Sequence, residues 1–475
     1  MATAPKPWLL AIPVEIQLAI CTEIVESFPF PRHRNGELPS PAPHDPNPTW
    51  KKVTLENFPA LGGLARTCKA LEQLTTPLLF ERVQVSVFRA TAFFQIIRHF
   101  SRFGHVAACV RHLTVGSAWD TSNLSASQAS FLLQEGRRLG LSPLPNYPPD
   151  LASNPVESKA ILVDVLLCQV PALRKLDLFL SQYLHEGVAS SVLSYTTRLP
   201  DSYILGSLRH IKVHSRSPNW SANSFNRVSF TALLRHTPAV TCLQVGYCDG
   251  NAPQGIIQNL LPKLQDLHLF EGLAPDLASV AKFCPHLQRF RIEAGATASP
   301  SIGHFMSSYT AIIPGRDSAL NALLPLSTTL QDLNIDGSGL AILDIRAVSD
   351  MARFSSLRSL RWIFLRWPDG DNAMLLDKLP PAIESLCLGG EDMPIYDIGV
   401  LLRERLRSGQ LPGLRRFMYL LVHTELEPGM AETVARLFEG TGVDCSPASL
   451  ADDGGISTEA GYFLWPEERE EGASD

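Results

Sequence analysis

The chain has 475 residues, of which 45% are apolar, and its 41 basic and 47 acidic side chains leave a formal net charge of −6. The pI is near 6.1 and no segment is polybasic, so we expect neither nucleic acid nor a membrane as partner. No run reaches the roughly eighteen apolar residues that a membrane helix requires. These properties leave another protein as the expected partner.

The N-terminal segment predicts helices interrupted by a proline-rich insertion. Every fourth position from Ile12 to Ile24 is apolar, and Pro13 suits a first helical turn, so we expect a helix over residues 8–27. Eight prolines between residues 28 and 59 favour an extended, flexible insertion. Pro77 predicts the start of a further short helix before a strand near Val83. A second helix is predicted between the insertion and Pro77, with the apolar stripe Leu61, Leu64, Ala65, Cys68, Leu71 and Leu74.

A short motif then recurs, in which an apolar residue is followed three and five positions later by two more. The intervals from Ile211 to Leu243 and from Leu243 to Leu267 are 32 and 24 residues, lengths that fit one strand and one crossover helix. The pattern predicts an α/β solenoid over residues 105–440. Its clearest copies are Leu173-Arg-Lys-Leu176-Asp-Leu178, Leu264-Gln-Asp-Leu267-His-Leu269, Leu287-Gln-Arg-Phe290-Arg-Ile292, Leu330-Gln-Asp-Leu333-Asn-Ile335 and Ile383-Glu-Ser-Leu386-Cys-Leu388.

Two longer intervals leave the unit count open. They span 63 residues from Leu113 to Leu176 and 43 from Phe290 to Leu333, and imply either loop insertions or a degenerate unit. The Ser- and Pro-rich stretch 121–155 is the candidate for such an insertion. A helix over 430–439 should close the stack. The C-terminal segment 441–475 ends in an acidic tail that we expect to be disordered.

Both parts of the chain resemble one protein family. Ile12-Pro-Val-Glu-Ile16, Leu64-Ala-Arg-Thr-Cys68-Lys-Ala-Leu71 and Pro77-Leu-Leu-Phe-Glu-Arg-Val83 resemble the first helix, second helix and close of a fungal-type F-box. The later motif is similar to irregular leucine-rich repeats. The resemblance assigns residues 8–88 to an F-box-like helical domain, with the insertion at 28–59, and residues 105–440 to the repeats.

An F-box/leucine-rich-repeat protein implies a curved horseshoe with parallel strands on its concave side, preceded by a small all-α domain. It also implies the substrate-recognition subunit of an SCF-type (Skp1-cullin-F-box) E3 ubiquitin ligase. The partners would be a Skp1-like adaptor, the cullin-RING ligase and an unknown protein substrate. Carried over by position, the adaptor contacts would be Ile12, Pro13, Ile16, Ile20, Leu64, Cys68 and Leu71.

Two alternatives stay open for these parts. The N-terminal helices could instead cap the open end of the solenoid, as terminal repeats require. The whole chain could be a leucine-rich-repeat protein-binding scaffold that is not connected to ubiquitination. Deletion of the N-terminal segment would then cost stability alone.

Strand residues that alternate with the buried leucines point to the concave surface, where a substrate would bind. Arg289 and Arg291 could hold a carboxylate or phosphate there, although exposed arginines are usually just solvated. We interpret the histidines as solvent-facing, not as metal ligands. The predicted substrate-binding residues are Lys175, Asp177, Phe179, His210, Lys212, His214, Asp266, His268, Phe270, Arg289, Arg291, Glu293, Asp332, Asn334 and Asp336.

The chain carries no recognisable catalytic motif. GxSxG, HExxH, the GxxxxGK[ST] phosphate loop and a GxGxxG after a strand are all missing from the sequence. Cys284-Pro-His286 could suggest a reactive thiol, but a cysteine in the repeat core is the commoner case. We therefore expect a protein that is not an enzyme and that uses no cofactor or metal. Nine scattered cysteines without a CxxC pair favour the cytoplasm or nucleus.

Overall fold

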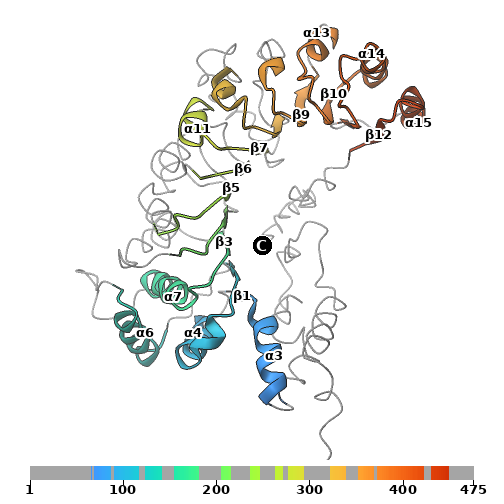
Figure 1. The fold of residues 1–475 in the computed structure, drawn as a ribbon. Coiled ribbons are helices and arrows are strands. Elements are labelled where there is room, and N and C mark those ends of the chain that lie inside the picture. Colours follow the sequence, from blue (N-terminus) through green and yellow to red (C-terminus); the bar gives the residue numbers. More distant parts are fainter. Residues whose placement is uncertain are drawn as a thin grey trace, which may run out of the picture.

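A computed structural model gives the architecture of the chain. Its strands form one open sheet of twelve strands in the order β1 to β12, and each strand pairs in parallel with the next (Figure 1). This arrangement confirms the predicted α/β solenoid. The structure describes residues 66, 69–86, 90–116, 124–141, 155–180, 205–215, 236–246, 263–270, 277–293, 321–337, 351–367, 372–421 and 429–448.

Each unit of the solenoid contributes one short strand. The sheet extends past the predicted limits of the repeats, because β1 lies within the predicted F-box segment and β12 within the predicted C-terminal segment. The strands are β1 (Arg82–Ser86), β2 (His112–Gly116), β3 (Lys175–Leu180), β4 (His210–Ser215), β5 (Cys242–Gly246), β6 (Asp266–Phe270), β7 (Arg289–Glu293), β8 (Asp332–Gly337), β9 (Ser359–Arg366), β10 (Ser385–Glu391), β11 (Arg416–Leu421) and β12 (Asp444–Pro447).

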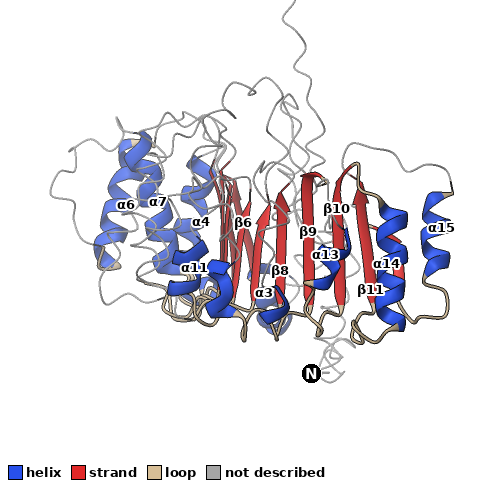
Figure 2. Ribbon diagram, turned by 90° about the horizontal axis from the view of Figure 1, so that it is seen from above, coloured by secondary structure: helices blue, strands red, loops and turns tan. Residues whose placement is uncertain are grey.

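Helix α3 lies at the end of the sheet next to β1, and the other described helices lie along the outer side of the curved sheet, as Figures 1 and 2 show. None of these helices is long and apolar enough to span a membrane. The helices are α3 (Lys69–Phe80), α4 (Ala90–Arg102), α5 (Gly104–Ala107), α6 (Ala126–Arg138), α7 (Pro155–Gln169), α11 (Leu277–Phe283), α13 (Asn372–Asp377), α14 (Ile395–Arg407) and α15 (Met430–Leu437), with 3-10 turns η5 (Asn321–Leu326) and η7 (Met351–Arg353).

The leucines of the motif stack in register to form the core. Leu176 pairs with Leu113 on one side and with Ile211 on the other, and all three side chains are fully buried. Leu178 pairs in the same way with Val213 of the next strand. A strand with two buried apolar positions cannot cover them alone, so each unit depends on its neighbours for burial.

A repeated backbone hydrogen-bond pattern joins consecutive units. The carbonyl of Arg111 accepts bonds from the N–H groups of Arg174 and Lys175, at 2.7 and 2.9 Å. The carbonyl of Gln265 accepts from Gln288 and Arg289, both at 2.8 Å. The same two-to-one pattern recurs at the residue before each strand, from Glu81 to Glu384. We call this series the carbonyl ladder.

A tight turn leads into most strands. The N–H of the first motif leucine bonds to the carbonyl three residues earlier, for example from Leu287 to Cys284 at 3.1 Å and from Leu414 to Leu411 at 3.2 Å. Pro285 and Pro412 occupy the second position of these turns, where their fixed φ is favourable and their missing N–H is not needed. At these two turns the proline therefore forms part of the turn itself.

No additional strand enters the sheet in either of the two long intervals. β2 pairs directly with β3, and β7 pairs directly with β8, so no hidden unit lies between them. The stretch 121–155 was expected to be a loop excursion, yet it contains helix α6. Ser125 explains the start of this helix, because its hydroxyl accepts from the N–H of Gln128 and the Gln128 side chain returns a bond to the Ser125 N–H.

Helix α3 is not interrupted at Pro77. One continuous helix runs through this proline, so the prediction that Pro77 starts a separate helix is wrong. Pro77 removes one helical hydrogen bond. Buried Leu71 before it and Phe80, which packs on the core after it, hold both parts of the helix in place. The helix predicted over residues 8–27 lies outside the described residues.

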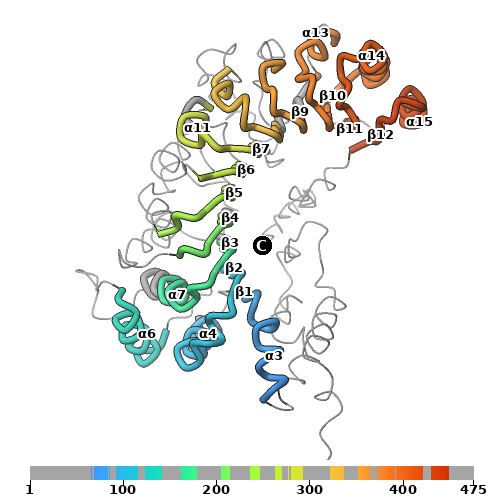
Figure 3. Tube along the Cα trace, viewed as in Figure 1, coloured from blue at the N-terminus to red at the C-terminus, as the bar shows by residue number. Residues whose placement is uncertain are grey.

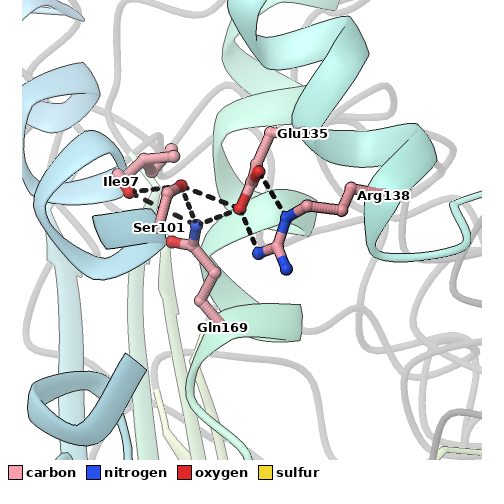
Figure 4. Close-up of polar contacts among 5 residues, drawn as sticks. All are labelled: Ile97, Ser101, Glu135, Arg138 and Gln169. Atoms are coloured by element: carbon pink, nitrogen blue, oxygen red, sulfur yellow. Dashed lines mark hydrogen bonds and ion pairs between the residues drawn. The ribbon is translucent and has the colours of Figure 1, made fainter. Parts of the chain in front are cut away.

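A buried polar network joins α4, α6 and α7 (Figure 4). Glu135 is 6% exposed, and its carboxylate accepts two bonds from Arg138, at 2.6 and 2.8 Å. Gln169 Nε2 donates to Glu135 Oε1 at 3.0 Å, and Ser101 Oγ lies 2.7 Å from the same oxygen. The bonds from Arg138 outweigh burial and lower the pKa of Glu135 to about 2.

Replacing this carboxylate should destabilise the protein in a pH-dependent way. Because the folded-state pKa lies below the ordinary value of 4.5, the ionised form stabilises the fold above pH 4.5 and this contribution is lost as the pH falls toward 2. We expect Glu135→Gln to lower the free energy of unfolding by about 2 kcal/mol at pH 7. Urea unfolding of the wild-type and Glu135→Gln proteins at pH 7 and pH 3 measures this difference in the free energy of unfolding. Exposed Glu404→Gln is the control, and equal effects of both variants would contradict the role of the network.

Candidate protein-binding surface on the concave side of the sheet

Figure 3 shows the strands that form the inner face of the curved sheet. The strand residues that alternate with the core leucines form columns across this face. The first column precedes the first strand leucine and the second column follows it. The pairing registers give the first column as Arg82, His112, Lys175, His210, Cys242, Asp266, Arg289, Asp332, Ser359, Ser385, Arg416 and Asp444. They give the second column as Gln84, Thr114, Asp177, Lys212, Gln244, His268, Arg291, Asn334, Arg361, Cys387, Met418 and Ser446.

The register places the predicted substrate-binding residues on this face. Lys175, His210, Asp266, Arg289 and Asp332 lie in the first column. The second column contains Asp177, Lys212, His268, Arg291 and Asn334. The remaining predicted residues form a third column by backbone register, and their side chains are not described: Phe179, His214, Phe270, Glu293 and Asp336.

His112, Thr114 and Arg361 are among the face residues that were missed from the sequence. His112 and Thr114 flank Leu113 on β2, and Arg361 lies between Leu360 and Trp362 on β9. The same alternation would have identified them, because Leu113 and Leu360 occupy motif positions.

The two arginines expected to bind an anion are paired within the sheet. Arg289 Nη2 lies 3.0 Å from Asp266 Oδ2, and Arg291 Nη2 lies 3.2 Å from Asp332 Oδ2. Each pair joins adjacent strands: Asp266 and Arg289 are directly opposite, and Arg291 and Asp332 are diagonal neighbours. A ligand carboxylate or phosphate at Arg289 or Arg291 would have to displace an internal partner.

Asp177 is the centre of a second charged group. Its Oδ2 lies 2.7 Å from His112 Nε2 and 3.4 Å from Lys175 Nζ. Burial would raise the pKa of Asp177, but the hydrogen bond from His112 and the positive charges of His112, Lys175 and His210 hold it below its usual value. Asp177 is therefore ionised and fixes the neighbouring basic side chains.

Several polar residues of the second column are more buried than an exposed strand face suggests. The exposed fractions of His268, Asn334 and Arg361 are 6%, 5% and 9%. The interpretation of His268 as solvent-facing is therefore wrong. Neighbouring strands lie only about 4.8 Å apart, so long side chains in one column cover each other.

His210 is also shielded from solvent. Burial, with the positive charge of Lys175, lowers the pKa of His210 to about 4. Its Nε2 lies 3.9 Å from Cys242 Sγ on the next strand. His210 is therefore neutral near pH 7, and the positive charge at this end of the face comes from lysine and arginine.

Buried apolar side chains line part of the last units of the face. Ile363 and Cys387 are each 1% exposed, and Leu420 is 7% exposed. Gly389 lies between Ile363 and Leu420 in the register of β9, β10 and β11. A Cβ at Gly389 would lie 2.8 Å from the Leu420 carbonyl oxygen, so the close approach of the strands requires glycine at this position.

The predicted adaptor contacts fall almost entirely outside the described residues. Ile12, Pro13, Ile16, Ile20, Leu64 and Cys68 belong to that undescribed part. Leu71 is described, and at 4% exposure its side chain is not available to a partner in this structure.

The structure agrees with the interpretation of Cys284 as a core residue. Its side chain is fully buried, and burial raises the pKa of the thiol to about 12. The described residues contain no group of three or more His, Cys, Asp or Glu side chains that could hold a metal ion.

Comparisons with known proteins do not assign this chain to a family. No family model matches the chain, and no curated protein matches its sequence. Among solved structures, a chain of the crystal structure of the Rad7 and Elc1 complex in yeast aligns with 13% identity over 81% of this chain and 94% of that chain. The TM-score is 0.26, so the two backbones do not superpose closely over that span.

Acidification should destabilise the face through His210. Because its folded-state pKa of about 4 lies below the ordinary value of 6.5, the unfolded chain binds the extra proton first and stability falls as the pH drops below 6.5. We expect a loss of about 2 kcal/mol between pH 7 and 5, which His210→Gln should abolish. Urea unfolding at both pH values measures this. The exposed His286→Gln is the control and should keep the full pH dependence; an unchanged loss in His210→Gln would contradict the assignment.

Enlarging Gly389 should separate the last strands. We expect Gly389→Ala to lower the free energy of unfolding by roughly 1–3 kcal/mol, because the new methyl group meets backbone and not a flexible side-chain end. Gly104→Ala is a matched control, since a Cβ there meets nothing within 4 Å. Denaturant unfolding followed by circular dichroism compares the two, and a stable Gly389→Ala protein would show that the strands can move apart without cost.

Proposed function

We propose that this protein is the substrate-recognition subunit of an SCF-type E3 ubiquitin ligase. The N-terminal F-box-like segment would bind a Skp1-like adaptor, which connects it to the cullin-RING ligase. The concave columns would bind the protein that is ubiquitinated. The receptor itself would be non-catalytic, would need no cofactor, and would act in the cytoplasm or nucleus.

One observation carries the proposal. Helix α3, which contains the end of the F-box-like sequence, is separated from β1 by Glu81 alone. The Glu81 carbonyl accepts from the N–H groups of Arg111 and His112, at 2.8 and 3.0 Å, and so begins the carbonyl ladder. An adaptor bound at the N-terminal segment would therefore be held in a fixed relation to the concave face, as a receptor requires.

A protein-binding scaffold without a ligase is the second candidate. Leu71 is buried, and the Phe80 ring stacks on His99 of α4 with centroids 5.8 Å apart. These contacts favour a helix that covers the first end of the solenoid, which is the role of a terminal cap. A chain lacking residues 1–68 retains α3 and β1, and separates the two functions because only the receptor would lose a partner.

The adaptor interface is tested by co-purification. We expect the wild-type protein to retain a Skp1-like adaptor, and Pro13→Ala combined with Ile16→Asp to lose it at least tenfold, because a buried charge would replace an apolar contact. Arg415→Glu, at the opposite end of the sheet, is the control. Circular dichroism should show both variants folded. Failure of the wild-type protein to bind any Skp1-like adaptor would favour the scaffold.

A further inference from the structure

Three consecutive units place an arginine at the same position beside the sheet. Arg111, Arg174 and Arg209 are successive members of the carbonyl ladder, immediately before β2, β3 and β4 (Figure 3). Arg174 and Arg209 are exposed and Arg111 is half-buried. We call these three residues the arginine row.

Two of these guanidinium groups are held by turn carbonyls. Arg111 Nη1 lies 3.0 Å from the Ala108 oxygen and 3.2 Å from the Ala172 oxygen of the following unit. Arg209 Nη1 lies 2.8 Å from the Gly206 oxygen. Neutral carbonyls fix the orientation of both groups without cancelling their charge, so further N–H donors of each fork can bind an anion.

Of the residues next in the chain, Lys175 adds a positive charge. His112, Lys175 and His210 follow the three arginines and lie in the first column. Asp177 is the acidic group on this part of the face, and it is already bound to His112 and Lys175. The carbonyl ladder begins with Glu81, one ladder position before Arg111, and the structure records no ion pair between these two residues.

Later units differ at the same ladder position. Gln265, Gln288 and Gln331 are uncharged, and Arg358 forms an ion pair with Glu384 of the next unit. Within the described ranges no carboxylate pairs with Arg111, Arg174 or Arg209. The unneutralised positive charge is therefore concentrated in the first units, where three consecutive members of the carbonyl ladder are arginines. Arg415 is a single further arginine of the ladder near its far end.

We propose that the arginine row binds an acidic or phosphorylated peptide segment of a partner protein. The proposal rests on the receptor function above for its biological role and names the substrate class of that receptor. The shared chemistry is an oxyanion, either carboxylate or phosphate, which pairs with the forked donors of arginine.

The spacing of the row specifies the ligand further. Adjacent strands lie about 4.8 Å apart, so the outer two arginines are roughly 10 Å apart. This equals about three residues of a polyproline II segment at roughly 3.1 Å each, in which positions i and i+3 lie on the same side. Two oxyanions three positions apart would therefore match Arg111 and Arg209. Nucleic acid is disfavoured, because the chain has a net charge of −6 and the row offers only a short basic surface.

The test uses the full-length protein and labelled eight-residue glycine peptides in a fluorescence anisotropy titration. One probe carries phosphoserine at its third and sixth positions, a second carries glutamate there, and a third carries glutamine. We expect an acidic probe to bind at least tenfold more tightly than the glutamine probe, with affinity falling as salt rises. Arg174→Glu combined with Arg209→Glu should weaken acidic-probe binding by about tenfold or more.

Arg415→Glu is the matched control, since it reverses an exposed charge at the same ladder position in a distant unit. It should bind as the wild type does. Tighter binding of the phosphoserine probe identifies phosphate as the ligand, and equal binding identifies carboxylate. Equal affinity for acidic and neutral probes, an unaffected double variant, or tighter binding of a labelled oligothymidine would each overturn the proposal. Adaptor binding is measured separately, so either result can fail alone.

Discussion

The shared carbonyl of the ladder determines how one unit sits on the next. Two consecutive N–H groups directed at one oxygen leave little freedom for a unit to slide or rotate, because a slip by one residue would reverse which side chains face the core. The registers accordingly continue without a shift over the first eight strands. Stacking of the leucines buries apolar surface, and the carbonyl ladder restricts the stacked units to one alignment.

This alignment also explains the chemistry of the concave face. Side chains in one column are brought to about the spacing between strands, where like charges repel and opposite charges pair. Asp266 with Arg289, which lie directly opposite, and Asp332 with Arg291, which are diagonal neighbours in adjacent columns, are the result. Where no acid follows on the next strand, as at Arg174, the charge stays available at the edge of the sheet. The face is thus divided into a basic region and a region of ion pairs along the chain.

The repeat could be predicted from the sequence because its signal is local and restated many times. Leu176, Leu267 and Phe290 each identify a strand by spacing alone, and all are buried in the structure. The pairing of Arg289 with Asp266 could not be predicted in this way, since it depends on which unit lies beside which. The capping bonds of Ser125 and Gln128 are a sequence signal that was overlooked among the surrounding serines.

Other features depend on the tertiary structure. The continuity of α3 through Pro77 requires the packing of Phe80 on the core, which no local pattern reports. The lowered pKa of His210 and the burial of His268 arise from neighbours on adjacent strands. The predicted adaptor contacts before Leu71 stay predictions, because they lie outside the described residues.

The unequal lengths of the returns between strands have a consequence for the order of folding. Leu360 and Leu386 are 26 residues apart, whereas Leu113 and Leu176 are 63 apart, so closing the second connection costs more chain entropy. Contacts in such a fold are made only between neighbours, and structure can therefore nucleate in one region and spread. The units around β9 to β11 are the natural nucleus, and β2 and β3 would join last.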